Sequence, residues 1–232
     1  YLFTKSDPMN FKFPKMIAAA LTVISVSMTA QDAPKYDYNA AFNPFFYKNN
    51  GTETRSASGK PGHNYWQNRA DYILNATLNE AKKEITGSAE ITYTNNSFDN
   101  LEFLWLQLDQ NLFKKDSRGN AIIPLSGSRN GAKGQQFDGG YTIKNVEIIS
   151  TNGKNMKVAP RYFITDSRMQ IDLPQELKAK GGVVKFKIDY AFVSPDYGSD
   201  RMGVEDTKNG KIFTVAQWFP RMAVYDDISG WN

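Results

Sequence analysis

The regular alternation of apolar and polar residues constrains the fold of this chain more than any other feature. It recurs in four segments, Arg69–Leu78, Glu84–Thr94, Tyr141–Ile149 and Gly182–Val193. In an extended strand this pattern puts apolar side chains on one face and polar side chains on the other. The first two segments are joined by the short polar stretch 79–83. They therefore predict a β-hairpin.

Three further segments complete the pattern. Leu101–Leu108 is mostly apolar, which is typical of a strand covered on both sides. Met169–Leu173 and Lys211–Phe219 are also predicted strands, and Pro174–Lys180 is the one predicted helical turn. Strands without long helices between them favour antiparallel sheets. The predicted fold class is all-β.

The N-terminal part has the organisation of an export signal. Lys12 and Lys15 precede an uncharged run, residues 16–28, that is too short to span a bilayer. We therefore predict a signal peptide at 9–30, no membrane span, and a periplasmic or extracellular location. Residues 1–8 precede the first Met and are interpreted as a non-native upstream extension. Residues 31–64 lack a strand or helix period and are rich in Asn, Gly, Ser, Lys and Pro, so they predict a linker or arm before a β domain at 65–232.

Composition excludes several kinds of chemistry. The chain has no cysteine and one histidine, His63. Disulfides and thiol catalysis are excluded, and a catalytic zinc site that needs two or three histidines cannot form from this chain alone. His63 lies among Gly, Pro and Asn and is interpreted as a solvated linker residue. The net charge of +4 is too small and dispersed to indicate a nucleic-acid partner.

Three other candidate sites have simpler interpretations: a phosphate loop, a carboxylate pair for metal binding or acid/base chemistry, and an aromatic platform for sugar. The glycine-rich stretch 127–140 lacks the Lys-Ser/Thr ending and following helix of a phosphate loop, which favours a hairpin excursion. Adjacent residues of a strand point to opposite faces, so Asp226 and Asp227 are interpreted as turn residues that cap backbone N–H groups. Trp105 is expected in the core, whereas Trp218 and Phe219 at a strand end are expected to be exposed or at a domain interface.

Two stretches carry a resemblance to a known family. They are YWQNRADYILNATLNEAKKEITGSAEITYTNNSFDNLEFLWLQL and QWFPRMAVYDDISGWN. With the strands between them, Trp66–Asn232 resembles the N-terminal domain of the aminopeptidase N (gluzincin) family of zinc metallopeptidases, especially exported members from Bacteroidetes-type bacteria. The closing stretch is the more specific of the two, because its turn residues and aromatics stand at fixed offsets.

The resemblance implies a saddle-like antiparallel β-sandwich that caps a separate, thermolysin-like catalytic domain. The GxMEN-type exopeptidase motif and the zinc-binding HExxH motif of that domain do not occur in this sequence. The resemblance thus implies a fragment of an enzyme that removes N-terminal residues from peptides. The fragment alone is expected to be inactive. Its partners are a peptide substrate and its own missing catalytic domain, which holds the Zn²⁺.

The resemblance also implies one substrate-binding residue. Gln217 fits the position of a family Gln or Glu that holds the free α-amino group of the substrate, although Val215 stands where several relatives have a second Gln. A side-chain carbonyl can accept hydrogen bonds from an ammonium group. Gln217 as an ordinary polar strand residue remains an open alternative. The alternative function is a non-catalytic exported β-sandwich module that binds a glycan or cell surface through Trp218, Phe219 and Tyr225.

Overall fold

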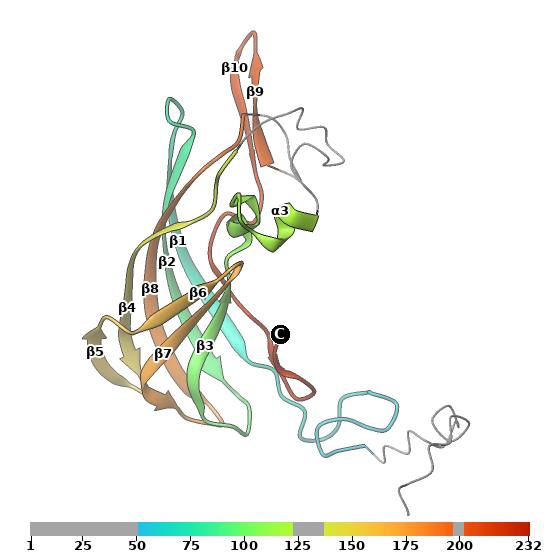
Figure 1. Cartoon of the computed structure of the whole chain (residues 1–232). Helices are drawn as coiled ribbons and strands as arrows, with labels where there is room; N and C mark the ends of the chain where they lie inside the picture. Colours follow the sequence, from blue (N-terminus) through green and yellow to red (C-terminus); the bar gives the residue numbers. More distant parts are fainter. Residues whose placement is uncertain (1–50, 123–136, 197–201) are drawn as a thin grey trace, which may run out of the picture. The chain divides into compact units, whose positions relative to one another are not determined.

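The largest sheet is built by the alternating segments. The computed structural model describes residues 51–122, 137–196 and 202–232, all within the unit Gly51–Asn232 (Figure 1). This sheet has five antiparallel strands in the order β1-β2-β8-β4-β5. The strands are β1 (Arg69–Asn79), β2 (Glu84–Asn95), β8 (Gly182–Val193), β4 (Thr142–Thr151) and β5 (Lys154–Val158).

A second antiparallel sheet has four strands in the order β11-β3-β7-β6. These strands are β11 (Arg221–Met222), β3 (Leu101–Gln107), β7 (Arg168–Leu177) and β6 (Tyr162–Thr165). Two hairpins pair only within themselves, β9 (Met202–Thr207) with β10 (Gly210–Val215) and β12 (Tyr225–Asp226) with β13 (Gly230–Trp231). Two short helices follow β3, η1 (Asp109–Phe113) and α3 (Arg118–Ile122).

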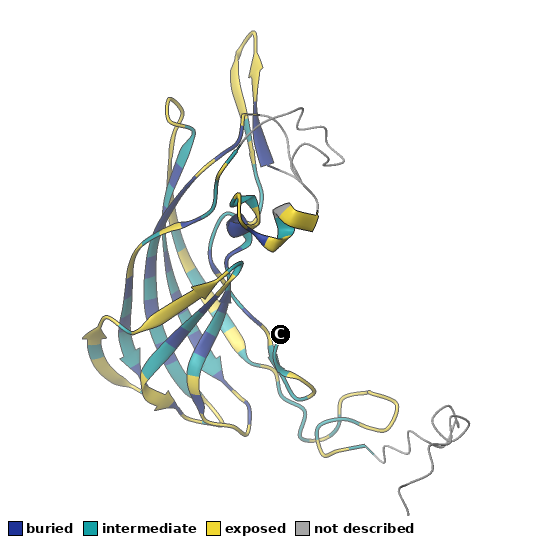
Figure 2. Cartoon of the chain, in the orientation of Figure 1, coloured by how far each residue is buried: buried dark blue, intermediate teal, exposed yellow. Residues whose placement is uncertain are grey.

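One hydrophobic core joins the two larger sheets. Burial alternates along β2 and along β8 from Val184 to Tyr190, so every second side chain of these stretches is buried (Figure 2). Leu104 and Ile171 of the smaller sheet belong to the same buried cluster as Ile91 and Ile188 of the larger one. At β2, Gly87 leaves room for the Tyr190 ring, because a Cβ at residue 87 would overlap that ring. The strand β6 is exposed along its whole length.

The prediction of an all-β, antiparallel fold is confirmed. The predicted hairpin forms with Arg69 opposite Thr94 and Asn79 opposite Glu84. Lys211–Phe219 is a strand only to Val215, where β10 ends. Trp105, expected in the core, is only partly buried on β3. Most of the glycine-rich stretch 127–140 and the predicted signal peptide at 9–30 lie outside the described residues.

The predicted helical turn at Pro174–Lys180 is wrong. Residues 174–177 are extended and belong to β7. The register against β3 shifts here, since Leu177 pairs with Leu101 whereas Asp172 pairs with Phe103. Proline has no backbone N–H to donate and is tolerated at such an irregularity. Leu177 is fully buried, so burial in the core outweighs the local helix propensity of this segment.

Two other observations concern the segment before β1 and the length of the helices. Residues 51–64 form a loop with one isolated bridge, between Arg55 and Pro61, and no strand. Across the ranges 51–122, 137–196 and 202–232, no helix has the length and apolar character needed to cross a membrane.

Candidate substrate-binding site around Gln217

The backbone at Gln217 has an uncommon conformation. Its φ is 51°, in the left-handed region. Five other non-glycine residues of the described chain share a positive φ. Lys83, Asn152 and Asp166 lie in turns between paired strands, Lys180 lies in the connection from β7 to β8, and Lys157 lies within β5. Gln217 instead lies in the loop between β10 and β11. A residue with a Cβ is disfavoured here by about 1–2 kcal/mol, so its surroundings must hold it.

Two buried side chains bind this loop through its carbonyl groups. The Gln110 amide donates to the carbonyl oxygen of Ala216 at 2.8 Å and to that of Gln217 at 3.2 Å. The Tyr141 hydroxyl donates to the Gln217 carbonyl oxygen at 3.1 Å. Gln110 is 2% exposed and Tyr141 is 5% exposed. Three hydrogen bonds from buried side chains therefore hold the backbone carbonyl groups of Ala216 and Gln217.

The side chain of Gln217 is exposed. Within the described residues, its amide makes no hydrogen bond, although its main-chain carbonyl is bonded twice. The side-chain carbonyl oxygen is consequently available as an acceptor and the side-chain NH₂ as a donor. An exposed amide on a fixed backbone is a suitable group for binding a polar ligand.

The charged groups near this loop neutralise each other. Arg221 binds Asp109 in a fork, with Nε–Oδ2 at 2.7 Å and Nη2–Oδ1 at 3.1 Å. This hydrogen bond raises the pKa of Arg221, against an opposing effect of burial. Burial also raises the pKa of Tyr141, so its hydroxyl remains protonated and a donor at neutral pH. The loop thus lies beside a paired acid and base.

Asp226 is the last residue of β12, and its side chain caps backbone N–H groups of the turn that follows, as predicted. Its Oδ1 accepts from the N–H groups of Ile228 at 2.9 Å and Ser229 at 2.8 Å, and its Oδ2 accepts from Asn232 at 2.8 Å. The hydrogen bond from the Ser229 N–H is the largest cause that lowers the pKa of Asp226. A carboxylate with these partners stays ionised and is not an exchangeable acid at neutral pH.

Asp227 binds a distant arginine instead of capping the turn like Asp226. The Arg55 guanidinium donates to Asp227 from Nε at 2.8 and 2.9 Å, and the Thr54 hydroxyl donates to Oδ2 at 2.8 Å. Arg55 is the largest cause that lowers the pKa of Asp227. The two carboxylates therefore have separate partners and do not form an acid/base pair. Local sequence gave no signal for this ion pair, because its residues lie 172 positions apart.

The predicted aromatic platform does not form as one surface. Trp218 contacts Phe219 at 5.3 Å between ring centroids, and Phe219 contacts Tyr72 at 5.4 Å. Tyr225 instead packs between Trp66 and Trp231, at 5.8 and 5.1 Å. All three residues of the proposed platform are partly buried and pack against the core. No single exposed face therefore presents Trp218, Phe219 and Tyr225 to a glycan.

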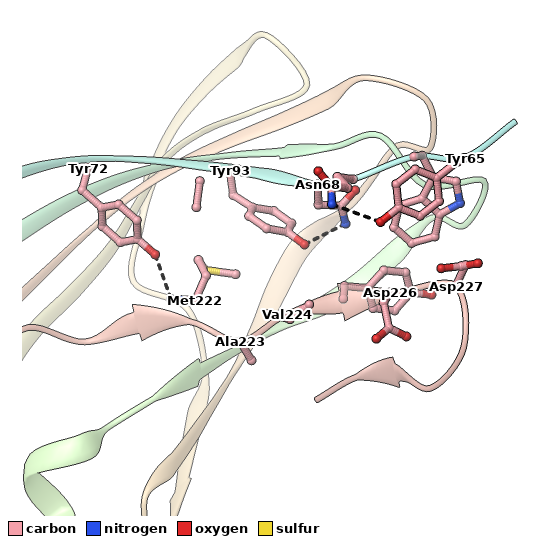
Figure 3. Close-up of a pocket in the computed structure, with 13 residues that line it drawn as sticks. Tyr65, Asn68, Tyr72, Tyr93, Met222, Ala223, Val224, Asp226 and Asp227 are labelled. Carbon is pink, nitrogen blue, oxygen red and sulfur yellow. Dashed lines mark hydrogen bonds between the residues drawn. The ribbon is translucent and has the colours of Figure 1, made fainter. Parts of the chain in front are cut away.

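A hollow of about 380 Å³, drawn in Figure 3, has Trp66 and Tyr225 among the residues that line it. Its polar side chains already have partners. The Asn68 amide donates to the Tyr93 hydroxyl at 2.8 Å, and the Met222 N–H donates to the Tyr72 hydroxyl at 2.9 Å. Tyr225 donates to Asp99 at 2.9 Å, and burial is the main cause that raises its pKa to about 12. These tyrosines act as structural hydrogen-bonding groups at neutral pH.

The described residues do not fit a zinc site. In the ranges 51–122, 137–196 and 202–232, no group of three or more His, Cys, Asp or Glu side chains could hold a metal ion. His63 is exposed, as expected. The prediction that zinc binds outside this chain, in a catalytic domain, stays a prediction.

Comparisons with known proteins give a weak likeness. No family profile matches the sequence, and no curated protein matches it. An M1 zinc metallopeptidase from Deinococcus radiodurans, a mutant solved with a Tyr-Ser-Ala substrate, is similar to this chain with 12% identity and a TM-score of 0.33, over 59% of this chain and 23% of its own. A two-domain M1 zinc metallopeptidase mutant bound to L-tryptophan has 12% identity and a TM-score of 0.34, over 62% and 24%. The match thus spans about a quarter of the length of these proteins, and a likeness of this size does not assign the chain to a family.

Proposed function

We propose that this chain is the N-terminal β domain of an exported zinc aminopeptidase, an enzyme that removes N-terminal residues from peptides. In this role the domain covers part of the active site, and Gln217 binds the free amino end of the substrate. The zinc ligands lie in a catalytic domain outside this chain, which is its partner. The complete enzyme works in the periplasm or outside the cell.

The state of Gln217 is the observation that supports this proposal most directly. Its side-chain amide is exposed and has no partner within the described residues, whereas its backbone is fixed in a disfavoured conformation by buried donors. Such a conformation is costly and is found more often where a residue has a function. The amide oxygen can accept a hydrogen bond from a substrate ammonium group, and an internal peptide bond does not supply that donor. The sequence resemblance at 217–232 supports the same role.

The test uses the complete gene product and the substitution Gln217→Ala. We expect kcat/KM for aminoacyl substrates to fall about tenfold or more, roughly the effect of one hydrogen bond to a charged group. Gln175→Ala is the matched control, because Gln175 is also exposed and lies in β7, away from the β10–β11 loop. An unchanged kcat/KM in Gln217→Ala removes this residue from the site.

A second measurement tests the division of labour between the domains. The 232-residue chain alone should show no peptidase activity and should bind no zinc in stoichiometric amounts, as measured by metal analysis after dialysis. Peptidase activity in this chain would contradict the proposed dependence on a separate catalytic domain.

A further inference from the structure

The exposed side chain of Gln217 does not follow the alternation of exposed and partly buried side chains in β10, the strand that precedes it. In β10, Phe213 and Val215 are partly buried and Thr214 between them is exposed. If the strand continued, residue 217 would lie on the same inner face as Phe213 and Val215. Instead, Ala216 is partly buried and Gln217 is exposed. The left-handed backbone at Gln217 is the local change that accompanies this reversal.

The groups that bind this backbone come from the ends of both larger sheets. Gln110 lies in η1, directly after β3 of the four-stranded sheet. Tyr141 directly precedes β4 of the five-stranded sheet. Asn111, the neighbour of Gln110 in the chain, connects Gln110 to Tyr141, because its Oδ1 accepts from the Tyr141 N–H at 2.9 Å. Its Nδ2 also donates to the Asp166 carbonyl at 2.8 Å. The donors that meet at Gln217 are thus themselves fixed in place.

We propose that Gln110 and Tyr141 are positioning residues, which hold Gln217 in the left-handed conformation and so turn its side-chain amide toward the amino end of the substrate. This inference rests on the proposed function of Gln217. Neither positioning residue touches the substrate, since both are almost fully buried. Without their hydrogen bonds, the backbone relaxes toward the extended conformation that the β10 pattern favours. The Gln217 amide then leaves the position in which it accepts from an ammonium group.

The experiment compares Gln110→Met and Tyr141→Phe in the complete gene product. Methionine has nearly the volume of glutamine without its donors, and phenylalanine keeps the buried ring of Tyr141. The readout is the ratio of inhibition constants for an amino acid hydroxamate and for its analogue that lacks the α-amino group. A purely structural role would change the amount of folded enzyme but would leave this ratio unchanged. Tyr93→Phe is the control, because Tyr93 is equally buried and its hydroxyl also has a hydrogen-bond partner, Asn68.

We expect Gln110→Met to reduce the preference for the amino-bearing inhibitor about tenfold, as Gln217→Ala does. Tyr141→Phe should reduce it less, since Gln110 still donates to the loop, and it also supplies a milder variant if Gln110→Met folds poorly. Adding Gln217→Ala to Gln110→Met should produce no further loss, because both substitutions act through one side chain.

The outcomes separate the two proposals. If Gln217→Ala loses the preference but Gln110→Met and Tyr141→Phe keep it, the positioning role is wrong and the proposed function stands. If Gln217→Ala itself keeps the preference, the role of Gln217 is wrong, and the positioning role falls with it. If the Tyr93→Phe control loses the preference as well, the effect is not specific to the β10–β11 loop, and the positioning role is again wrong.

Discussion

Replacing Gln217 by glycine separates the stability of this loop from its function. The left-handed backbone at φ 51° disfavours a residue with a Cβ by about 1–2 kcal/mol. Glycine removes this strain but has more freedom in the unfolded chain, which offsets about 0.5–1 kcal/mol. Because the Gln217 side chain is exposed and makes no hydrogen bond within the described residues, little else is lost. Gln217→Gly should therefore stabilise the chain by about 0.5–1 kcal/mol.

Thermal unfolding of the 232-residue chain measures this gain. For a chain of this size, the expected increase in Tm is about 1–4 °C. Gln217→Ala removes the same side chain but keeps the strain, so its Tm should stay within about 1–2 °C of the parent. Lys157→Gly is a matched control, because Lys157 has a φ of 53°, is exposed and lies in β5. It should raise Tm in the same way and leave the kinetics of the complete enzyme unchanged.

The same substitution should lower the activity of the complete enzyme. Gln217→Gly lacks the amide, so its kcat/KM for aminoacyl substrates should fall as far as that of Gln217→Ala. A residue that is costly for stability and needed for activity shows this opposite behaviour. A Tm of Gln217→Gly at or below that of Gln217→Ala refutes the reasoning, because it means that the backbone at residue 217 is not strained.

Two further predictions concern the core and the Arg55–Asp227 pair. Gly87→Ala forces a Cβ against the fully buried Tyr190 ring and should cost about 1–3 kcal/mol, measured by urea unfolding; an unchanged midpoint would show that Tyr190 has room to move. The pKa of Asp227 is lowered in the folded chain, so its ion pair stabilises the fold above about pH 4 and loses this effect as the pH falls through the lowered value. Asp227→Asn should accordingly lower Tm at pH 7 but not below the folded pKa, and an equal difference at both extremes would contradict the ion-pair explanation.

Sequence patterns predicted the strands whose burial is regular. Along β2, and along β8 from Val184 to Tyr190, alternation in sequence matches alternation in burial, because one face of each strand packs on the core. The hairpin of β1 and β2 was predictable for the same reason, together with its short polar turn. At Pro174–Lys180, in contrast, local composition favoured a helical turn. The pairing of Leu177 with Leu101, a contact distant in sequence, determines the extended conformation there.

The candidate site was only partly predictable. The resemblance indicated Gln217 as a binding residue, but the side chains that hydrogen-bond its backbone carbonyl, Gln110 and Tyr141, lie far away in the sequence. The Asx-type bonding of Asp226 followed from the local preference of aspartate for turns. The partner of Asp227 did not, because a single sequence contains no record of which arginine comes close to it in the fold.

The strand order of the larger sheet has a consequence for the synthesis of the chain. β2 pairs with β1 immediately, but its other neighbour, β8, begins at Gly182, long after β2 ends at Asn95. At ordinary ribosomal rates, the nascent chain waits roughly 5–15 s before that partner emerges. During this interval a long alternating strand presents unpaired backbone groups to any other extended chain. We therefore expect intramolecular pairing of β2 to compete with aggregation, and we expect chaperone binding or slower production at low temperature to raise the yield of the native sheet.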